Sequence, residues 1–248
     1  MTAYAIDPIN MNASRHVNGE ALAIFAHELR QPLASILFAV QSMHESGDDE
    51  DAGREMCQVV ERQGRFLAGM IEDVLELHCC TRGKLCLEMR RVDPLSIIAA
   101  AVETTHPLFA ARGQRLTVSL PDQTPSVIAD PVRLQQVVAN LLSNAAKYTE
   151  SGGCVRLAVE ATTELLTIEV RDNGIGIPAE LLPRVFDLFE QGDVTQHRGW
   201  CGLGIGLALV KCLVELHGGS VAAQSDGPGA GSAFLVRLPN ANGERKIG

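Results

Sequence analysis

The chain has 248 residues, of which 46% are hydrophobic and only 4% aromatic, so it can fill an aliphatic core in one large domain or two ordinary ones. Its formal net charge of −9, without any basic run, argues against nonspecific binding to nucleic acid or to an anionic membrane. No apolar run approaches the roughly 20 residues that a membrane span needs, and residues 1–19 lack the basic start and apolar core of a signal peptide. The composition therefore predicts a soluble protein.

The cysteines do not form a recognisable framework. There are seven of them, an odd number without regular spacing, and only Cys79 and Cys80 are adjacent. No pair has the spacing of a CxxC motif or of a Cys/His zinc site. We therefore expect reduced thiols in a cytosolic, cytoplasmic protein.

Two heptad patterns dominate the first third of the chain, after a lead-in of residues 1–13. They run over residues 14–45 and about 50–78, on either side of the acidic, glycine-bounded turn 47–53. The seam residues are Leu22, Leu29, Ile36 and Met43 with Ala26, Leu33 and Val40, then Met56, Gln63, Met70 and Leu77 with Val60, Leu67 and Val74. A hairpin of two such helices has too little core to be stable alone. We expect two copies to pair through residues 14–80 as a four-helix bundle, which makes the protein a homodimer.

His27 lies in the first helix, one residue past a seam position, and is followed by Glu28 and by Pro32. A neutral imidazole is nucleophilic near pH 7, and Glu28 can hydrogen-bond the ring nitrogen that does not attack. Taken alone, a His-Glu pair is more often an ordinary feature of a helix surface. The nucleotide-binding features later in the chain favour the catalytic interpretation.

The rest of the chain predicts an α+β domain after a linker at residues 81–90. Expected strands cover residues 85–91, 115–120, 127–129, 154–161, 165–171, 221–225 and 233–238, and expected helices cover residues 94–111, 131–149 and 202–217. The strands 154–161 and 165–171 alternate apolar and polar residues, which predicts an antiparallel pair with one buried face. The fold class is therefore a helical hairpin followed by a mixed sheet with helices on one face.

The helix 131–149 carries a polar stripe beside its apolar one. Asn140, Asn144 and Lys147 are spaced four and then three residues apart, so they share one side of the helix. A carboxamide oxygen can complete the shell of a Mg²⁺ ion held by water and phosphate oxygens, and a lysine can meet a phosphate as a point charge. Two asparagines alone would more often be the polar rim of a half-buried helix.

Two glycine-rich segments complete the nucleotide-binding features. Asp172 directly follows a strand, and an ionised aspartate, which only accepts hydrogen bonds, suits the exocyclic amine of adenine. Gly174 and Gly176 allow the backbone to approach a flat base. The segment 202–206 opens a helix, where free amide groups can bind phosphates.

A dinucleotide-binding unit is the alternative for the first of these segments. Gly174, Gly176 and Ala179 fit its loose glycine pattern. Pro178 and the antiparallel strands upstream do not suit that unit, so we reject it.

Together these segments resemble the catalytic core of two-component sensor histidine kinases over roughly residues 14–240. Their boxes match at residues 27–32 (H), 140–148 (N), 172–176 (first glycine), 186–189 (F) and 202–206 (second glycine). The resemblance implies a dimerisation and phosphotransfer hairpin at residues 14–80. It also implies a Bergerat-type ATP-binding domain at residues 91–240, with a tail at 241–248. Residues 178–201 would form an ATP lid anchored by Phe186 and Phe189.

The resemblance also implies an activity. The chain would be an ATP- and Mg²⁺-dependent protein histidine kinase that phosphorylates its own His27 with the help of Glu28, then passes the phosphoryl group to an aspartate of a response regulator. Asn144 would hold the Mg²⁺ ion. The nucleotide-binding residues would be Asn140, Asn144, Lys147, Tyr148, Asp172, Gly174, Gly176, Gly202, Leu203, Gly204 and Gly206.

Three departures from the family pattern matter. Gln31 stands where many members carry Thr or Asn. In the family, that position helps to orient the water that dephosphorylates the partner. Phosphatase activity therefore depends on whether a Gln amide can orient this water. Cys201 precedes the second glycine box where a Gly is usual, and we expect ATP binding to survive. No sensing domain precedes residue 14 and no receiver domain follows residue 240, so we expect either a part of a larger sensor or a protein that receives its input from elsewhere.

Two rival functions fit part of this pattern. Another Bergerat-fold ATPase, of the chaperone or mismatch-repair type, would not need the heptad hairpin that carries His27. A degenerate kinase serving as a dimeric scaffold would not need intact His27, Asn144 and Asp172. The sequence therefore favours an active kinase over both.

Overall fold

The computed structural model describes residues 14–45, 49–190 and 204–241, with the backbone alone for residues 14–25 and for His27 and Glu50. The described residues up to Glu72 form one compact unit, and those from Asp73 onward form another. The prediction of a helical region followed by an α+β domain is confirmed.

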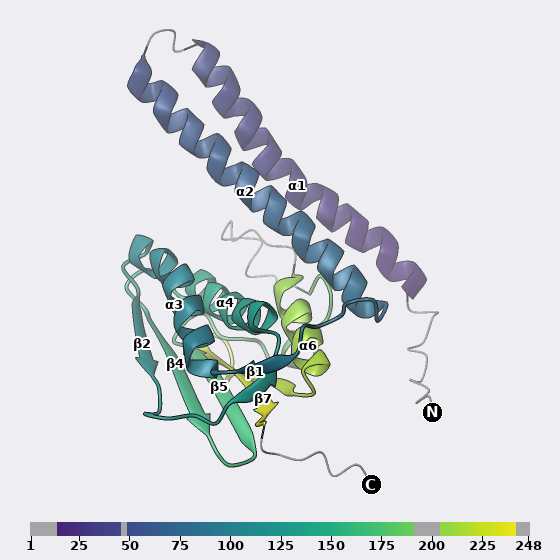
Figure 1. The fold of residues 1–248 in the computed structure, drawn as a ribbon. Coiled ribbons are helices and arrows are strands. Elements are labelled where there is room, and N and C mark those ends of the chain that lie inside the picture. Colours follow the sequence, from purple (N-terminus) through teal and green to yellow (C-terminus); the bar gives the residue numbers. More distant parts are fainter. Residues whose placement is uncertain (1–13, 46–48, 191–203, 242–248) are drawn as a thin grey trace. The chain divides into compact units, whose positions relative to one another are not determined.

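The first unit is a helical hairpin (Figure 1) made of α1 (Ser14–Glu45) and most of α2 (Glu50–Thr81). α1 continues through Pro32, whose side chain is buried. α2 begins after Asp49, whose carboxylate accepts hydrogen bonds from the backbone N–H groups of Asp51 and Ala52 and so caps the helix. The last nine residues of α2, from Asp73 to Thr81, belong to the second unit.

The hairpin leaves a set of large apolar side chains in solvent. Leu33 is 50% exposed and Val40 is 40% exposed, although both lie on the predicted seam of α1. Other exposed apolar side chains of the hairpin are Leu37, Phe38, Phe66 and Ile71. A single copy of the hairpin therefore does not bury its own apolar surface.

The second unit is built on a five-stranded mixed sheet in the order β2-β4-β5-β7-β6 (Figure 1). β2 runs parallel to β4, and the other neighbours are antiparallel. The strands are β1 (Arg90–Val92), β2 (Arg115–Ser119), β3 (Val127–Ala129), β4 (Cys154–Ala161), β5 (Leu165–Asp172), β6 (Ser220–Gln224) and β7 (Ser232–Pro239). The helices are α3 (Pro94–Ala111), α4 (Pro131–Tyr148), the short 3-10 helix η1 (Leu182–Arg184) and α6 (Gly206–Leu216).

The core of this unit is aliphatic, as the composition predicts. Among the described residues of this unit, only Phe109 and Phe234 contribute buried aromatic rings. The fully buried aliphatic side chains include Ile98, Leu134, Leu141, Leu142, Leu157, Leu166, Ile168, Leu209 and Leu213. Three of these belong to α4, so one face of α4 is fixed in the core and its other side chains have defined positions.

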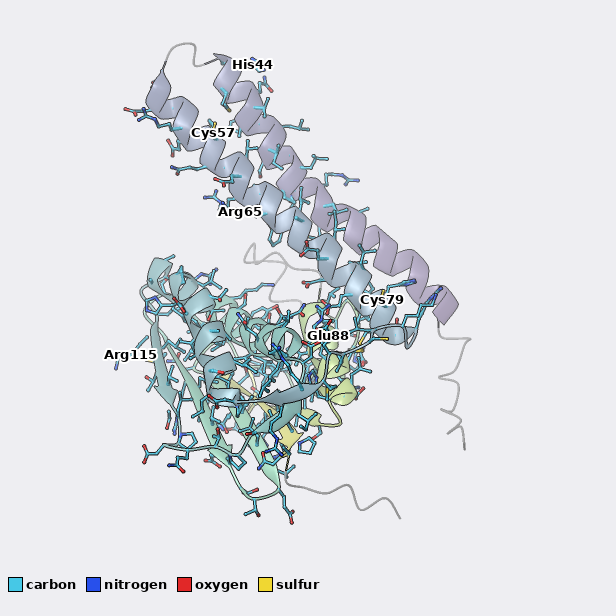
Figure 2. All side chains as sticks on the ribbon, in the orientation of Figure 1. His44, Cys57, Arg65, Cys79, Glu88 and Arg115 are labelled. Carbon is cyan, nitrogen blue, oxygen red and sulfur yellow. A yellow bond between two sulfur atoms is a disulfide. The ribbon has the colours of Figure 1, made fainter. Side chains whose placement is uncertain are left out.

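The strand predicted at residues 85–91 is wrong in extent. Only β1, Arg90–Val92, is a strand, and it pairs antiparallel with β3 outside the main sheet. The reason lies in the hydrogen bonds of the preceding residues. The N–H of Leu85 donates to Cys79 (3.2 Å), and the N–H of Glu88, labelled in Figure 2, donates to the Asp130 carboxylate (3.0 Å). Leu85 and Leu87 pack on the core without forming a strand.

The expectation that all cysteines are reduced is also wrong. Cys80, in the last turn of α2, forms a disulfide with Cys212 of α6. The two residues are 132 positions apart, so their pairing depends on how distant helices pack and leaves no mark in the local sequence. Cys57, Cys79, Cys86 and Cys154 are free thiols.

Asp130 joins three parts of the second unit. Its carboxylate caps α4 through the N–H groups of Val132 and Arg133 and also accepts the N–H of Glu88. Burial raises the pKa of the Asp130 carboxyl. These hydrogen bonds and the Arg133 charge lower it by more than burial raises it, so the pKa lies below its ordinary value. The backbone N–H of Asp130 donates to Nε2 of buried His217 (3.1 Å), whose Nδ1–H donates to Leu213.

Replacing Asp130 by alanine should lower the free energy of unfolding by about 2 kcal/mol at pH 7, because an N-cap and a third backbone hydrogen bond to a charged group are lost together. Urea denaturation measures the change. Asp93→Ala is the matched control: Asp93 caps α3 before Pro94 through Leu95 and Ser96 alone, and its loss should have the smaller effect.

This contribution should also depend on pH with a definite sign. A depressed pKa means that the stabilisation is fully present above the ordinary value of 3.8 and is lost as the pH falls below it, through the folded-state pKa. The difference between the parent and Asp130→Ala should therefore shrink below pH 3.8. A difference that stays constant over that range would contradict the role of the ionised carboxylate.

Across the part of the chain that the structure describes, no helix combines the length and the apolar character needed to cross a membrane.

Candidate nucleotide-binding site

A cavity of about 640 Å³ opens in the second unit, a volume in the range typical of small-molecule sites. It lies where α4, the loop after β5, the start of α6 and the start of β7 meet. Its lining residues are Asn144, Tyr148, Glu150–Gly153, Asp172–Pro178, Leu181, Val185, Glu190, Leu207, Pro228, Gly229, Ser232 and Phe234. Four of the residues predicted to bind nucleotide from their local motifs, Asn144, Asp172, Gly174 and Gly176, thus meet in one place.

Asp172 is the last residue of β5 and is only 7% exposed. One of its carboxylate oxygens accepts the N–H of Gly174 (2.8 Å), and the other accepts the hydroxyl of Ser232 (2.5 Å). A carboxylate offers about four acceptor positions, so these two bonds fix its orientation and leave capacity for a donor in the cavity.

The glycines after Asp172 are required by close contacts with protein backbone. A Cβ on Gly174 would lie 2.2 Å from the carbonyl oxygen of Tyr148, and one on Gly176 would lie 2.1 Å from that of Gly227. Gly176 also has a φ of +71°, which L side chains rarely adopt. The loop after β5 therefore packs tightly between the end of α4 and the turn before β7. Packing thus requires glycine at these two positions, in addition to the predicted approach of the backbone to a base.

Only part of the polar stripe of α4 lines the cavity. Asn144 lines it, whereas Asn140 and Lys147 are half-buried and are not among its lining residues. The side-chain nitrogen of Asn140 is buried and has no hydrogen-bond partner among the described residues. The Lys147 ammonium lies 4.8 Å from the ring centroid of Tyr148, over its face. Because Asn140 does not line the cavity, its part in nucleotide binding stays a prediction.

The start of α6 lies against Asn144. A Cβ on Gly206 would lie 4.0 Å from the Asn144 amide nitrogen, and no side chain of the described residues caps the first N–H groups of α6. Free N–H groups at a helix N-terminus attract anions. Gly204 has a φ of +66°, and its carbonyl accepts the N–H of Phe189 (3.2 Å). Gly202 and Leu203 lie outside the described residues.

The two phenylalanines predicted as lid anchors are both described. The Phe186 ring packs edge-on against Phe234, with centroids 6.1 Å apart and planes at 85°. Phe189 has a φ of +63°, a strained backbone for a bulky residue. Residues 191–201 of the predicted lid, Cys201 included, lie outside the described residues.

The H-box residues belong to the first unit, on α1. Glu28 is half-buried and Gln31 is exposed, with the carbonyl of Gln31 accepting the hydroxyl of Ser35 (3.1 Å). The backbone of His27 is helical. Its side chain, to which the catalytic prediction applies, is outside the described part of the chain.

Sequence reasoning missed Ser232, Asn173 and Phe234. Ser232 holds the Asp172 carboxylate, and Asn173 accepts the N–H of Cys154 (2.8 Å). The only available signal was Gly231 before the last strand, because a Cβ there would lie 2.1 Å from the carbonyl oxygen of Asp172. Within the described ranges, no group of three His, Cys, Asp or Glu residues could hold a metal ion by itself.

Two family models match the chain. Residues 17–79 match the His Kinase A (phospho-acceptor) domain, and residues 129–242 match the histidine kinase-, DNA gyrase B- and HSP90-like ATPase. The first match contains His27 and the second contains the cavity.

Curated proteins show the same similarity along nearly the whole chain. The circadian input-output histidine kinase CikA of Synechococcus elongatus is 36% identical over 92% of the chain, and the sensor histidine kinase RcsC of Escherichia coli is 34% identical over 88%. The chain spans 30% and 23% of the lengths of these relatives.

Solved structures agree in fold. ShkA in complex with AMPPNP has a TM-score of 0.66 and 26% identity, covering 89% of this chain and 46% of its own. The histidine kinase ThkA in complex with the response regulator TrrA has a TM-score of 0.69 over 95% of this chain and 66% of its own. At 21% identity, the likeness to ThkA shows the fold alone.

Proposed function

Because the chain belongs to the histidine kinases, in which it corresponds to the catalytic core of a sensor, we propose that it is an ATP-dependent protein histidine kinase. In this proposal His27 takes the γ-phosphoryl group of ATP and passes it to an aspartate of a response regulator. The observation that carries the proposal is the cavity in which Asp172, held by Gly174 and Ser232, faces the same space as Asn144.

We assign the parts of the chain accordingly. Residues 14–80 are the dimerisation and phosphotransfer domain, residues 81–90 the linker and residues 91–240 the ATP-binding domain, between the lead-in 1–13 and the tail 241–248. The exposed apolar side chains of α1 and α2 support a homodimer, since a second hairpin would bury them. The response regulator is the partner implied by the family. A phosphatase role of Gln31 and a cytoplasmic location belong to the same proposal.

ATP binding follows from the lining of the cavity. Asp172 accepts the adenine amine, while Gly174 and Gly176 keep the loop close to the base. The free N–H groups at the start of α6 bind phosphate oxygens, together with the second glycine box, residues 202–206. Asn140, Lys147 and Tyr148 extend this phosphate-binding side along α4.

Asn144 and phosphate oxygens would hold a Mg²⁺ ion, with water completing its shell, because the carboxamide lines the cavity beside the start of α6. The ion would supply charge neutralisation on the triphosphate. A single carboxamide oxygen is a suitable ligand for Mg²⁺, because this ion binds in proteins through few side chains and several water molecules.

His27 is the nucleophile in the transfer. A lone pair of one imidazole nitrogen forms the N–P bond to the γ-phosphorus as the bond to the bridging oxygen breaks, and ADP leaves with that electron pair. Glu28 accepts a hydrogen bond from the other ring nitrogen and stabilises the positive charge on the ring. The chain's contribution is thus positioning and charge compensation.

The test is to incubate the chain with Mg²⁺ and γ-labelled ATP and to follow protein-bound label. We expect label that is lost in acid and stable in base, as for phosphohistidine, and that moves to a receiver domain when one is added. ATP hydrolysis without protein-bound label would support a different Bergerat-fold ATPase instead. The absence of both protein-bound label and ATP hydrolysis would support a scaffold.

Replacing Asn144 by alanine should slow Mg²⁺-dependent labelling about 100-fold, because the amide that completes the metal site is lost. Labelling rates over a range of Mg²⁺ concentrations provide the measurement. Ser143→Ala is the matched control, since Ser143 is exposed on the same turn of α4. Labelling of the Asn144 variant at the parent rate would rule out the metal role.

A further inference from the structure

The disulfide between Cys80 and Cys212 lies outside the nucleotide cavity and has no part in the proposed chemistry. The Cα atoms are 6.5 Å apart, within the usual range for a disulfide. Cys80 is buried and Cys212 is half-buried. Cys79, the neighbour of Cys80, is labelled in Figure 2 at the end of α2.

The disulfide strengthens a contact that other side chains already make within the second unit. The Glu76 carboxylate forms an ion pair with the Arg133 guanidinium and accepts a hydrogen bond from the Gln136 amide (2.7 Å), both on α4. The Glu76 side chain is only 9% exposed, and Leu77 is buried. The last turns of α2 are therefore held on the rest of the second unit by an ion pair, apolar burial and one covalent bond.

We propose that Cys80 and Cys212 are a reversible thiol-oxidation site that, when oxidised, fixes the end of α2 on α6 and slows phosphorylation of His27. The inference rests on the proposed kinase function. His27 lies in the first unit and the nucleotide cavity in the second. The γ-phosphate of ATP and the aspartate of a receiver domain cannot both contact His27 at the same time. The two units must therefore adopt at least two arrangements in each cycle.

The position of the disulfide explains why it would restrict that cycle. In the reduced chain, α2 is joined covalently to β1 only through the residues between them, and the ion pair and apolar contacts can dissociate. The disulfide adds a second covalent connection that bypasses the exposed residues Arg82, Gly83 and Lys84. States in which the end of α2 leaves α6 are then removed from the ensemble.

The oxidation can proceed by exchange with a small-molecule disulfide. The thiolate of Cys212, the more exposed partner, attacks one sulfur and releases one small-molecule thiol, leaving a mixed disulfide. The Cys80 thiolate then attacks the Cys212 sulfur and releases the second thiol. Two protein thiols and one disulfide thus become one protein disulfide and two thiols, and a dithiol reductant reverses the reaction. In a compartment that keeps thiols reduced, the resting form would be the dithiol.

The experiment compares the full chain equilibrated with reduced or with oxidised glutathione. We expect the oxidised protein to be labelled from γ-labelled ATP at least about tenfold more slowly, with nucleotide affinity nearly unchanged and the rate restored by reduction. Cys212→Ser and Cys80→Ser should be labelled at the reduced parent's rate under both conditions. Cys79→Ser, a free thiol one residue away, should keep the parent's response.

A second measurement detects the cross-link without relying on activity. After limited trypsin cleavage at Arg82 or Lys84, the two fragments should stay joined on a nonreducing gel in the oxidised parent and separate in Cys212→Ser. A cross-linked protein that is labelled as fast as the reduced one would overturn the switch, and so would a chain that forms no cross-link in oxidant. If neither form is labelled at all, the kinase function itself fails, which distinguishes the two proposals.

Discussion

Replacing His27 by alanine is expected to reduce protein-bound label from γ-labelled ATP to background. His27 combines a nucleophilic nitrogen with the adjacent carboxylate of Glu28, and unlike the second His-Glu pair of α1, His44-Glu45, it lies in the H box that ends at Pro32. ATP affinity should be nearly unchanged, because the cavity that would bind the nucleotide belongs to the other compact unit. Quantifying acid-labile label together with equilibrium binding of a fluorescent ATP analogue measures both effects.

Two other histidines provide matched controls for this experiment. His44 lies on α1 and His78 on α2, and both are exposed helical histidines. His44→Ala and His78→Ala should be labelled like the parent, which would show that loss of label does not follow from removing any histidine of α1 or α2. Label that persists in His27→Ala would assign the phosphorylation to another residue.

The elements that the sequence predicts well are those whose boundaries depend on neighbouring residues. Asp93-Pro94 and Asp130-Pro131 predict the starts of α3 and α4, and each aspartate does accept the N–H groups of the following turn. The pairing of β4 with β5 is equally local, because only three residues separate the strands. The heptad pattern likewise predicts both helices of the hairpin, since its seam requires a helical period.

The features that could not be predicted depend on contacts between distant residues. Ser232 bonds to Asp172 across 60 positions, and only the register between β5 and β7 brings them together. The disulfide depends on how α2 meets α6, and β1 is short because the N–H of Glu88 bonds to Asp130 instead of to a neighbouring strand. The candidate site could thus be predicted as a set of motifs, whereas the bonds that orient its side chains could not.

The parent chain is expected to bind ATP at least about tenfold more tightly than GTP. Adenine presents an amine donor where guanine presents a carbonyl acceptor, and the Asp172 carboxylate can only accept. With guanine in the cavity, two acceptors would face each other in a site where Asp172 is 7% exposed. An unpaired buried polar group costs about 1–3 kcal/mol, which corresponds to that discrimination or more. Competition between the two nucleotides for a fluorescent analogue measures the ratio.

Asp172→Asn should weaken ATP binding and narrow the gap to GTP, for a reason that the hydrogen bonds define. The N–H of Gly174 can only donate, so the amide oxygen must stay there, and the new NH₂ group takes the place that faces Ser232. The serine hydroxyl can turn to accept one of its hydrogens, which leaves the other as a donor where the carboxylate had accepted. Glu150→Gln is the matched control, because Glu150 is an exposed carboxylate that lines the same cavity. It should keep the parent's preference. If Glu150→Gln changed the preference and Asp172→Asn did not, Glu150 would be the residue that reads the base.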